Sequence, residues 1–438
     1  MLGTLKWKLM QKRGTRICEG KYRRSQILFL IDAAVINAAY VLTSGFFLSG
    51  FVIHLNGSDF IVAILNNSFT WAAILSVFSF LIFERIRTRK KLLIFTNAIS
   101  RFLSGSIVFL PLLFDDEKLI IALLTVMVII ANIMWGIYQL GWMIWYIEVA
   151  PEGKKSDYIY LRMLILRIAI TIAIQGMGYV LDYYDKSYTG FFIVFVTSLA
   201  LSANDVVILL FVDEPCYKTR EDVKYGAAMF FSPFSNPEFR KFLIYTFFFY
   251  LSITISTSFT SIYLIKYLEL DYKLISMINV ISYILMIVTT RFWDRMQGRK
   301  GNMFVIIVSS IFIMLDYLIY SFLTARTLFL LYLSAVVGGT GNGGFNTAIV
   351  AYRFELMPKS GKSIYEGWFK AIYGISVLLA PFIGEMLMNA IPESMEIAFS
   401  INRFRILYMI SFVLGGIVLF ASFYKPGLLL PGERDVNI

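Results

Sequence analysis

The chain has 438 residues, of which 58% are hydrophobic and only 16% are charged. A soluble globular domain carries roughly 25% charged and about 45–50% apolar residues, so a soluble protein of this length would lack the polar side chains to cover its surface. The formal net charge of +11 does not indicate a nucleic-acid partner, because the basic residues stand in short segments between apolar runs, as in the cytoplasmic loops of membrane proteins.

Twelve apolar runs follow one another along the chain, each long enough to cross roughly 30 Å of hydrocarbon as a helix. We predict membrane-spanning helices at 27–54, 60–83, 92–114, 119–147, 158–181, 189–212, 239–266, 271–292, 302–323, 327–354, 363–390 and 402–424. These runs are apolar on every side, whereas the strands of an outer-membrane barrel alternate apolar and polar residues. The sequence therefore predicts an all-α membrane protein with twelve transmembrane helices.

The longest polar break, 213–238, has the composition of a cytoplasmic linker and divides the chain nearly in half. We expect an N-terminal six-helix bundle at 27–212 and a C-terminal six-helix bundle at 239–424. Terminal segments at 1–26 and 425–438 flank the two bundles. Lys and Arg are concentrated before the first run and in every second connection. The positive-inside rule therefore places both termini in the cytoplasm, and we expect a multi-pass protein of the plasma (inner) membrane.

Two pairs of loops recur at equivalent places in the two halves. Residues 84–90 (ERIRTRK) parallel 294–300 (DRMQGRK). After the fourth and tenth runs, Glu148, Pro151, Lys155, Ser156 and Tyr158 match Glu355, Pro358, Lys362, Ser363 and Tyr365. Two matches in one register predict a duplicated six-helix unit. The segment 294–300 resembles the D-R-x-G-R-[RK] loop of the major facilitator superfamily, with one extra residue inside it, and the segment from Glu355 to Pro358 resembles that family's loop after its tenth helix.

The resemblance implies a secondary active transporter that moves a small organic solute by alternating access, with no catalytic residue. A carboxylate at a cytoplasmic helix end and its neighbouring arginines can hold a gate closed. The candidate gating residues are Glu84, Arg85, Arg89, Glu148, Asp294, Arg295, Gly298, Arg299 and Glu355. Alternatively, these side chains anchor the loops to lipid headgroups. The first loop copy has Thr88 where the family has glycine, which would tolerate a positive φ.

Ionisable residues inside membrane spans are costly and are functional candidates. Arg167 and Lys370 fall in equivalent helices of the two halves, and two cations would suit an anionic or zwitterionic solute. Alternatively, Glu366 neutralises Lys370 from four residues earlier in the same helix. Asp32 is a candidate proton-coupling carboxylate. Its alternative role is an ion pair with Arg23 or Arg24 at the cytoplasmic helix end.

In the family that the loops resemble, the first, fourth, seventh and tenth helices line a central cavity. Polar residues near the midpoints of these helices are therefore cavity candidates, although such residues also join helices to one another. They are Asn37, Tyr40, Asn132, Gln139, Thr254, Ser258, Asn342 and Asn346. The segment 338–344 contains five glycines, which predicts either a bending point or close helix packing.

Other functions stay open at this point. A drug or multidrug efflux antiporter would share the topology, although Asn132 stands where those members of the family carry an arginine, and the fifth span lacks their Gly-Pro motif. A lipid or lipid-linked oligosaccharide flippase would need a laterally open groove. A membrane-embedded enzyme would need clustered acids or histidines in a large non-cytoplasmic loop. We expect a monomer in the lipid bilayer with a small-molecule substrate, no nucleic acid and no cofactor. We expect no disulfide and no metal site either, because Cys18 and Cys216 both fall in predicted cytoplasmic segments.

Overall fold

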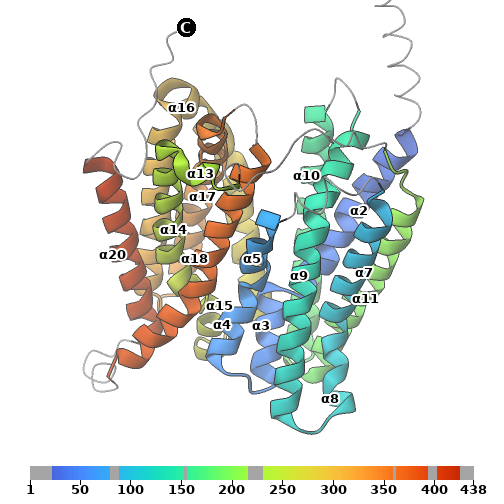
Figure 1. The fold of residues 1–438 in the computed structure, drawn as a ribbon. Coiled ribbons are helices and arrows are strands. Elements are labelled where there is room, and N and C mark those ends of the chain that lie inside the picture. Colours follow the sequence, from blue (N-terminus) through green and yellow to red (C-terminus); the bar gives the residue numbers. More distant parts are fainter. Residues whose placement is uncertain are drawn as a thin grey trace, which may run out of the picture. The chain divides into compact units, whose positions relative to one another are not determined.

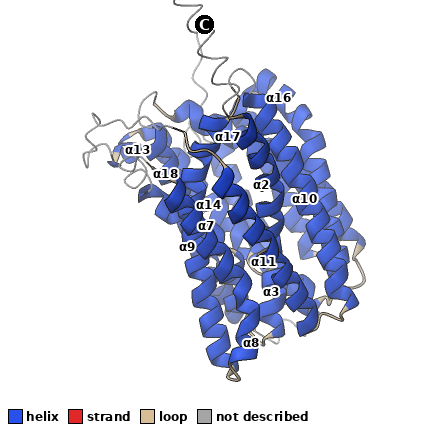
Figure 2. Cartoon of the chain, turned by 90° about the vertical axis from the view of Figure 1, so that its right-hand side faces the viewer, coloured by secondary structure: helices blue, strands red, loops and turns tan. Residues whose placement is uncertain are grey.

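The computed structural model describes residues 22–78, 88–151, 155–215, 230–358, 362–392 and 402–424. Every regular element within these ranges is a helix (Figure 2). Ten helical stretches in the described part of the chain are long and apolar enough to cross a membrane. These observations confirm the all-α membrane fold that the hydropathy pattern predicts.

The first compact unit comprises residues up to 47 together with 81–221. Its elements are α2 (Arg23–Leu42), α7 (Lys90–Ser106), η2 (Ile107–Phe109), α8 (Leu110–Leu113), α9 (Glu117–Val149), α10 (Lys155–Tyr183) and α11 (Tyr188–Phe211). Helix α2 packs against α10 and α11, and α7 packs against α9 and α11 (Figure 1). Phe29, Ala33 and Ile36 are buried, and their spacing of three and four residues turns one face of α2 into this core.

The second compact unit comprises 48–80 and the chain from 222 onward. Its elements are α4 (Asp59–Asn66), α5 (Ser68–Ala72), η1 (Ala73–Phe78), α13 (Ser232–Ser235), α14 (Pro237–Thr257), α15 (Thr260–Ile262), η3 (Tyr263–Tyr267), α16 (Tyr272–Ser321), α17 (Phe329–Leu356), α18 (Lys362–Ala390) and α20 (Arg403–Tyr424). Helix α3 (Gly45–His54) crosses from the first range into the second. Helix α16 packs along α17, and α14 packs against α18 and α20.

Residues 48–80, which the sequence assigns to the N-terminal bundle at 27–212, fall in the second compact unit, and the bounds of the two bundles stay a prediction. They pack with the second unit, chiefly against α18. Gly374 allows this approach, since a Cβ atom there would lie 2.7 Å from Cγ1 of Ile74 and 3.2 Å from its backbone nitrogen. The repeated loops mark where a duplicated unit begins and ends, but they carry no information on which helices share a packed core.

Two of the twelve predicted spans are not among the ten apolar helices. The stretch 60–83 is described only to residue 78 and consists of three short helices. The stretch 327–354 is helix α17, which has 28 residues, but its glycine, serine, threonine and asparagine residues lower its hydropathy. For these two stretches the membrane crossing stays a prediction.

The segment 294–300 is helical rather than a loop. Helix α16 includes one non-helical residue, Gly301, with φ 83° and ψ 169°. Two apolar stretches therefore meet at a single residue in a backbone region that essentially only glycine adopts. Gly298, which aligns with the family's motif glycine, lies inside the helix with no atom within 4 Å of where its Cβ would be. The positive φ expected at the motif glycine is thus found three residues later.

The glycines of 338–344 serve close packing. Helix α17 continues through them without a break. A Cβ at Gly339 would lie 2.6 Å from the carbonyl oxygen of Ser282, and a Cβ at Gly341 would lie 2.9 Å from that of Ser309. The glycines therefore let α17 approach α16 on both sides of Gly301, and the alternative of a bending point is not what the structure shows.

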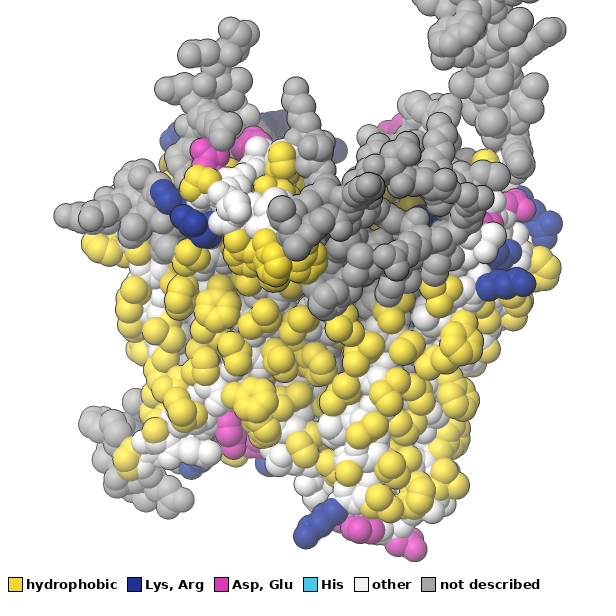
Figure 3. Space-filling model, viewed as in Figure 1, with side chains coloured by type: hydrophobic (Ala, Val, Ile, Leu, Met, Phe, Trp, Pro, Cys, Tyr) yellow, Lys and Arg dark blue, Asp and Glu magenta, His cyan; other side chains and the backbone are white. Residues whose placement is uncertain are grey.

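Large apolar side chains are exposed over the flanks of the helices. Figure 3 shows hydrophobic side chains along these flanks, with most charged side chains toward the helix ends. Phe102 and Phe420 are each 65% exposed, and Ile172 is 67% exposed. Such a surface is unfavourable in water and suits contact with lipid.

Candidate functional site

Two carboxyl groups are buried inside the first unit. Asp32 on α2 and Asp205 on α11 are both fully buried. They lie next to each other, close enough to hydrogen-bond once one of them holds a proton. Asn97 of α7 donates a hydrogen bond from Nδ2 to Oδ2 of Asp205 at 2.5 Å. Among the described residues, neither oxygen of Asp32 has a hydrogen-bond partner.

The surroundings of Asp32 differ from the alternative of an ion pair with Arg23 or Arg24. Its polar neighbours are Asp205, Arg162 and the indole of Trp142, while the guanidinium of Arg24 lies 5.6 Å from the centre of the Phe211 ring. Arg23 precedes Asp32 by about two and a half helical turns, which puts the two side chains on opposite faces of α2. The charged partners of Asp32 therefore come from other helices.

Two arginines flank the carboxyl pair. The guanidinium of Arg101 on α7 lies 3.7 Å from the centre of the Trp135 ring, and that of Arg162 on α10 lies 4.2 Å from Trp142. Cation–π contacts of this kind contribute about 0.5–2 kcal/mol, with the larger values at desolvated sites. Although all four charged residues are described, neither guanidinium forms an ion pair with either carboxyl group. Both arginines rest on aromatic faces instead.

The rings come from one face of α9. Trp135, Tyr138, Trp142, Trp145 and Tyr146 recur at spacings of three and four residues, which lines one side of a helix. All five are buried. Within the described ranges, the Tyr138 hydroxyl and the indole nitrogens of Trp135 and Trp142 have no hydrogen-bond partner. Sequence reasoning missed this stripe, although its spacing and the two arginines inside predicted spans could have revealed it.

We call Asp32, Asn97, Arg101, Arg162 and Asp205 the acid–arginine cluster. It joins α2, α7, α10 and α11 in the apolar interior of the first unit. Buried polar atoms without hydrogen-bond partners are uncommon, and they indicate a proton, a water molecule or a ligand that supplies the missing hydrogen bond. Chemically, the cluster can hold a proton on one of two adjacent carboxyl groups, beside fixed positive charge.

A second charged group lies in the second unit. Arg353 of α17 forms an ion pair with Glu366 of α18, with Nε 2.9 Å from Oε2, and its guanidinium lies 3.9 Å from the centre of the Phe369 ring. Lys370, one turn after Glu366, faces both charges. Glu366 thus takes Arg353 rather than Lys370 as its ion-pair partner. The group contains two cations and one carboxylate, so Lys370 has no ion-pair partner of its own in it. Sequence reasoning passed over Arg353 because it stands in the last turn of a predicted span.

The predicted cavity residues occupy different environments. Thr254 of α14 and Ser258, which directly follows that helix, are buried, and Ser258 accepts a hydrogen bond from Nδ2 of Asn67 at 2.8 Å. Gln139 on α9 and the pair Asn342 and Asn346 on α17 are exposed. The others are partly exposed: Asn37, Tyr40, Asn132, Arg167 and Lys370. The exposed amides suit a water-filled path, whereas the two buried hydroxyls serve helix packing.

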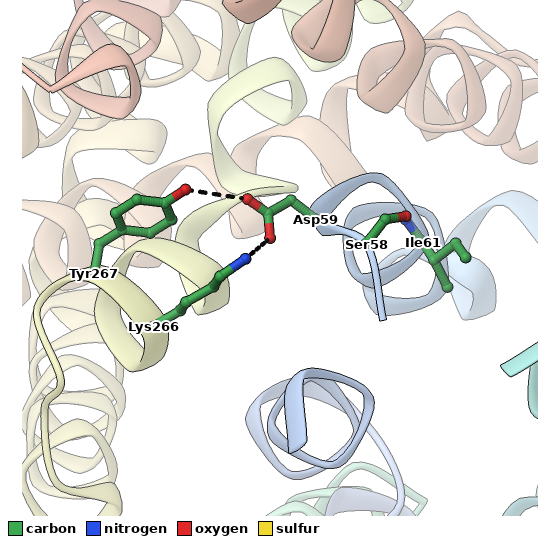
Figure 4. A network of polar contacts seen from close by, with 5 residues as sticks. All are labelled: Ser58, Asp59, Ile61, Lys266 and Tyr267. Carbon is green, nitrogen blue, oxygen red and sulfur yellow. Dashed lines mark hydrogen bonds and ion pairs between the residues drawn. The ribbon is translucent and has the colours of Figure 1, made fainter. Parts of the chain in front are cut away.

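A polar network joins α4 to η3 in the second unit (Figure 4). Lys266 Nζ lies 2.6 Å from Oδ1 of Asp59, and the hydroxyl of Tyr267 donates to Oδ2 of the same carboxylate at 3.4 Å. Ser58 caps α4 by accepting a hydrogen bond from the backbone N–H of Ile61 at 3.3 Å. The network is partly exposed, at the end of α4 that the positive-inside rule places outside the cytoplasm.

The family model described as Major Facilitator Superfamily matches residues 242–434. A solved structure of the nucleoside transporter NupG superposes with a TM-score of 0.73 at 15% identity, covering 91% of this chain and 99% of that one. The second half of the chain thus matches the model of the major facilitator superfamily, and the chain shares the fold of this solved transporter. A bacterial homologue of the iron transporter ferroportin gives a TM-score of 0.67 at 14% identity (90% and 97% covered). A D-xylose–proton symporter gives 0.66 at 13% identity (91% and 98% covered).

No curated protein matches the sequence significantly. The match over residues 242–434 agrees with the family that the repeated loops indicate, and the ten apolar helices of the described residues agree with a multi-pass membrane protein. The matched family model favours a transporter over a membrane-embedded enzyme. These three solved neighbours are under 25% identical, so they share the fold and leave the substrate to be argued from this chain's own residues.

The predicted gating residues have varied surroundings. Glu84 and Arg85 lie outside the described residues. Arg89 is buried before α7, where its backbone N–H and that of Lys90 bind the carboxylate of Glu214. A carboxylate at this helix end is favoured by the unpaired N–H groups and the helix dipole. The side chains of Glu148, Asp294, Arg295 and Arg299 are exposed, and Glu355 accepts a hydrogen bond from Nδ2 of Asn302 at 2.6 Å.

The second repeated loop has equivalent contacts in both halves of the transporter. The hydroxyl of Tyr158 donates to the carbonyl oxygen of Gln26 at 2.8 Å, and that of Tyr365 donates to the carbonyl oxygen of Ser232 at 3.4 Å. Each acceptor lies near the start of the first long helix of its own half. The matching contacts support the internal duplication that the sequence predicts.

Proposed function

We propose that this transporter moves a small organic solute with a negatively charged group, by secondary active transport with alternating access. One observation carries the proposal: Lys370 stands inside a membrane-spanning helix beside Arg353, and the nearby Glu366 is already paired with Arg353. An ionised lysine deep in a span costs about 2.5–3.5 kcal/mol on insertion scales. An anionic group of the solute would offset that penalty by supplying the missing counter-charge.

Two tyrosines support a solute site at this place. The ring centres of Tyr250 on α14 and Tyr373 on α18 lie 4.1 Å apart, and Tyr250 lies close to Arg353. Hydroxyls beside a cation are suitable donors to a carboxylate or phosphate. Arg167 on α10 is the corresponding cation of the first half, and its part in recognising an anionic or zwitterionic solute stays a prediction.

The setting of the transporter follows from the charge pattern. We place it as a monomer in the plasma (inner) membrane, with both termini in the cytoplasm, because Lys and Arg are concentrated in the connections on that side. The exposed charges of Asp294, Arg295 and Arg299 at the end of one apolar stretch of α16 suit a cytoplasmic gate. The solved neighbours include carriers of nucleosides, iron and xylose, so the fold itself favours no solute class.

The test is uptake into proteoliposomes of labelled carboxylates, amino acids, sugars, nucleosides and cationic drugs. We expect an anionic or zwitterionic solute to be taken up, and Lys370→Gln to raise its KM by roughly tenfold or more, since a charge-assisted hydrogen bond contributes about 1.5–3 kcal/mol. Lys362→Gln is the matched control, because Lys362 is exposed at the start of the same helix.

Three results would contradict parts of this proposal. Uptake of cations that Lys370→Gln and Arg167→Gln leave unchanged would favour the efflux antiporter of drugs. Movement of labelled lipid between leaflets without solute uptake would favour the flippase. An equal effect of Lys362→Gln and Lys370→Gln would remove the special role of Lys370.

A further inference from the structure

We propose that Asp32 and Asp205 together bind one exchangeable proton, with Arg101 and Arg162 as the counter-charges that take its place when it leaves. This inference rests on the proposed transport function, because it names the coupling ion and the residues that carry it. It goes beyond Asp32 alone by adding the sixth-span residue Asp205 and the two arginines.

The two carboxyl groups cannot both be charged without nearby compensation. Both are fully buried, and they are immediate neighbours. Two negative charges on adjacent side chains in a low-dielectric interior repel each other strongly, so one carboxyl group retains its proton and shares it with the other. Asn97 donates to Asp205, which makes Asp205 the better acceptor and Asp32 the group that carries the proton in this structure.

The arginines are near enough to compensate but are not paired. Each aspartate faces the other, Asp32 from α2 and Asp205 from α11. The other groups that face the two carboxyls are Asn97 and Arg101 from α7, Tyr138 and Trp142 from α9, and Tyr158 and Arg162 from α10. Arg162 is the cation beside Asp32, and Arg101 is the cation beside Asp205. Both guanidinium groups stack on indole rings and leave nitrogen atoms unpartnered among the described residues.

The cluster therefore has two balanced states. With the proton bound, two arginines and one carboxylate give a charge of +1, and the guanidinium groups stay on the rings. When the O–H bond of the protonated carboxyl breaks, the proton passes to water, two carboxylates remain, and the charge falls to zero. Each arginine then turns from its ring to the carboxylate beside it, exchanging a cation–π contact for an ion pair. Because these residues come from four helices, proton exchange repacks the whole unit.

Infrared difference spectroscopy between acidic and alkaline buffer tests the pair directly on the full-length protein in lipid. We expect the wild type to show the carbonyl band of a protonated carboxylic acid that disappears at alkaline pH. The band should be lost in both Asp32→Asn and Asp205→Asn, because without the neighbouring charge the remaining carboxyl is balanced by its own arginine. Asp316→Asn is the control, since Asp316 is an acid of the second unit bonded to Ser334 at 2.5 Å.

Several results would overturn the inference. If only one of the two aspartates is needed for the band, a single acid carries the proton and the pair is wrong. If neither is needed, no proton is held there. Should the Asn variants fail to fold, Asp32→Glu and Asp205→Glu must each shift the frequency of the same band. Arg162→Gln must keep the band at an alkaline pH where the wild type has lost it, which a packing defect alone would not do.

The same variants separate this inference from the proposed function. In proteoliposomes, Asp32→Asn and Asp205→Asn should abolish accumulation driven by an imposed pH gradient while solute exchange continues. A band that behaves as expected without any solute transport would contradict the proposed function alone. Solute transport without the paired band would contradict the proton site alone.

Discussion

Gly301 and Gly298 should respond in opposite directions to the same substitution, although they stand only three residues apart. Gly301 has φ 83° and ψ 169°, a region that non-glycine residues enter at a cost of about 1–3 kcal/mol. Gly301→Ala should therefore lower the free energy of unfolding by that amount. Gly298 is helical, and space surrounds its Cβ position. Gly298→Ala should be neutral or stabilising by up to about 1 kcal/mol.

Thermal unfolding of the purified protein in detergent, followed by the intrinsic fluorescence of its seven tryptophans, measures both effects. The wild type and the two variants need the same detergent and lipid, because bound lipid also changes Tm. Gly301→Ala should lower Tm by several degrees, and Gly298→Ala should leave it unchanged or raise it slightly. Equal losses in the two variants would refute the assignment of the positive-φ requirement to Gly301 alone. A larger loss at Gly298 would restore the motif glycine as the conformationally required residue.

Three further substitutions test packing and ion pairs, each by the same Tm measurement. Arg353→Gln should lower the free energy of unfolding by about 2 kcal/mol, which is less than for a fully buried ion pair because Glu366 is 28% exposed. Lys370→Gln should change stability little. Equal losses in the two variants would mean that Lys370 shares the ion pair. Gly339→Ala should lower the free energy of unfolding by about 1–3 kcal/mol through overpacking against α16. Gly416→Ala should leave it unchanged, because nothing lies near its Cβ position. A neutral Gly339→Ala would contradict the close contact between α17 and α16. Lys266→Gln removes the partly exposed ion pair with Asp59 and should lower the free energy of unfolding by about 0.2–1 kcal/mol at low salt and by less at high salt. A loss that does not depend on salt would indicate a role other than charge.

The sequence predicted the helices well, because apolar runs of about 20 residues have one common explanation in a membrane protein. The family also followed from it, since the repeated loops pair acids, arginines and glycine at fixed spacing. The packing of residues 48–80 did not follow, because it depends on contacts such as Gly374 with Ile74 between segments far apart in the chain. A repeat carries no signal for such contacts.

The candidate sites were predicted only in part. Asp32 and Lys370 stood out as ionisable residues inside apolar runs, and the structure gives each a charged neighbourhood. Their partners Asp205 and Arg353 were not recognised as such, because which charges meet depends on helix rotation and crossing, and hydropathy specifies neither. The assignment of Glu366 to Lys370 followed from spacing along one helix, but in the structure Arg353 of the neighbouring helix is the ion-pair partner of Glu366.

Counterflow in proteoliposomes tests the central claim, a solute carrier with alternating access, most directly. Vesicles are loaded with an unlabelled anionic solute identified by uptake and diluted into buffer with a trace of the labelled one, without ATP or an ion gradient. The account predicts a transient accumulation of label above its external concentration, since one saturable site faces each side in turn. Label that only equilibrates across the membrane, at a rate that does not saturate, would show a channel-like path and contradict the account.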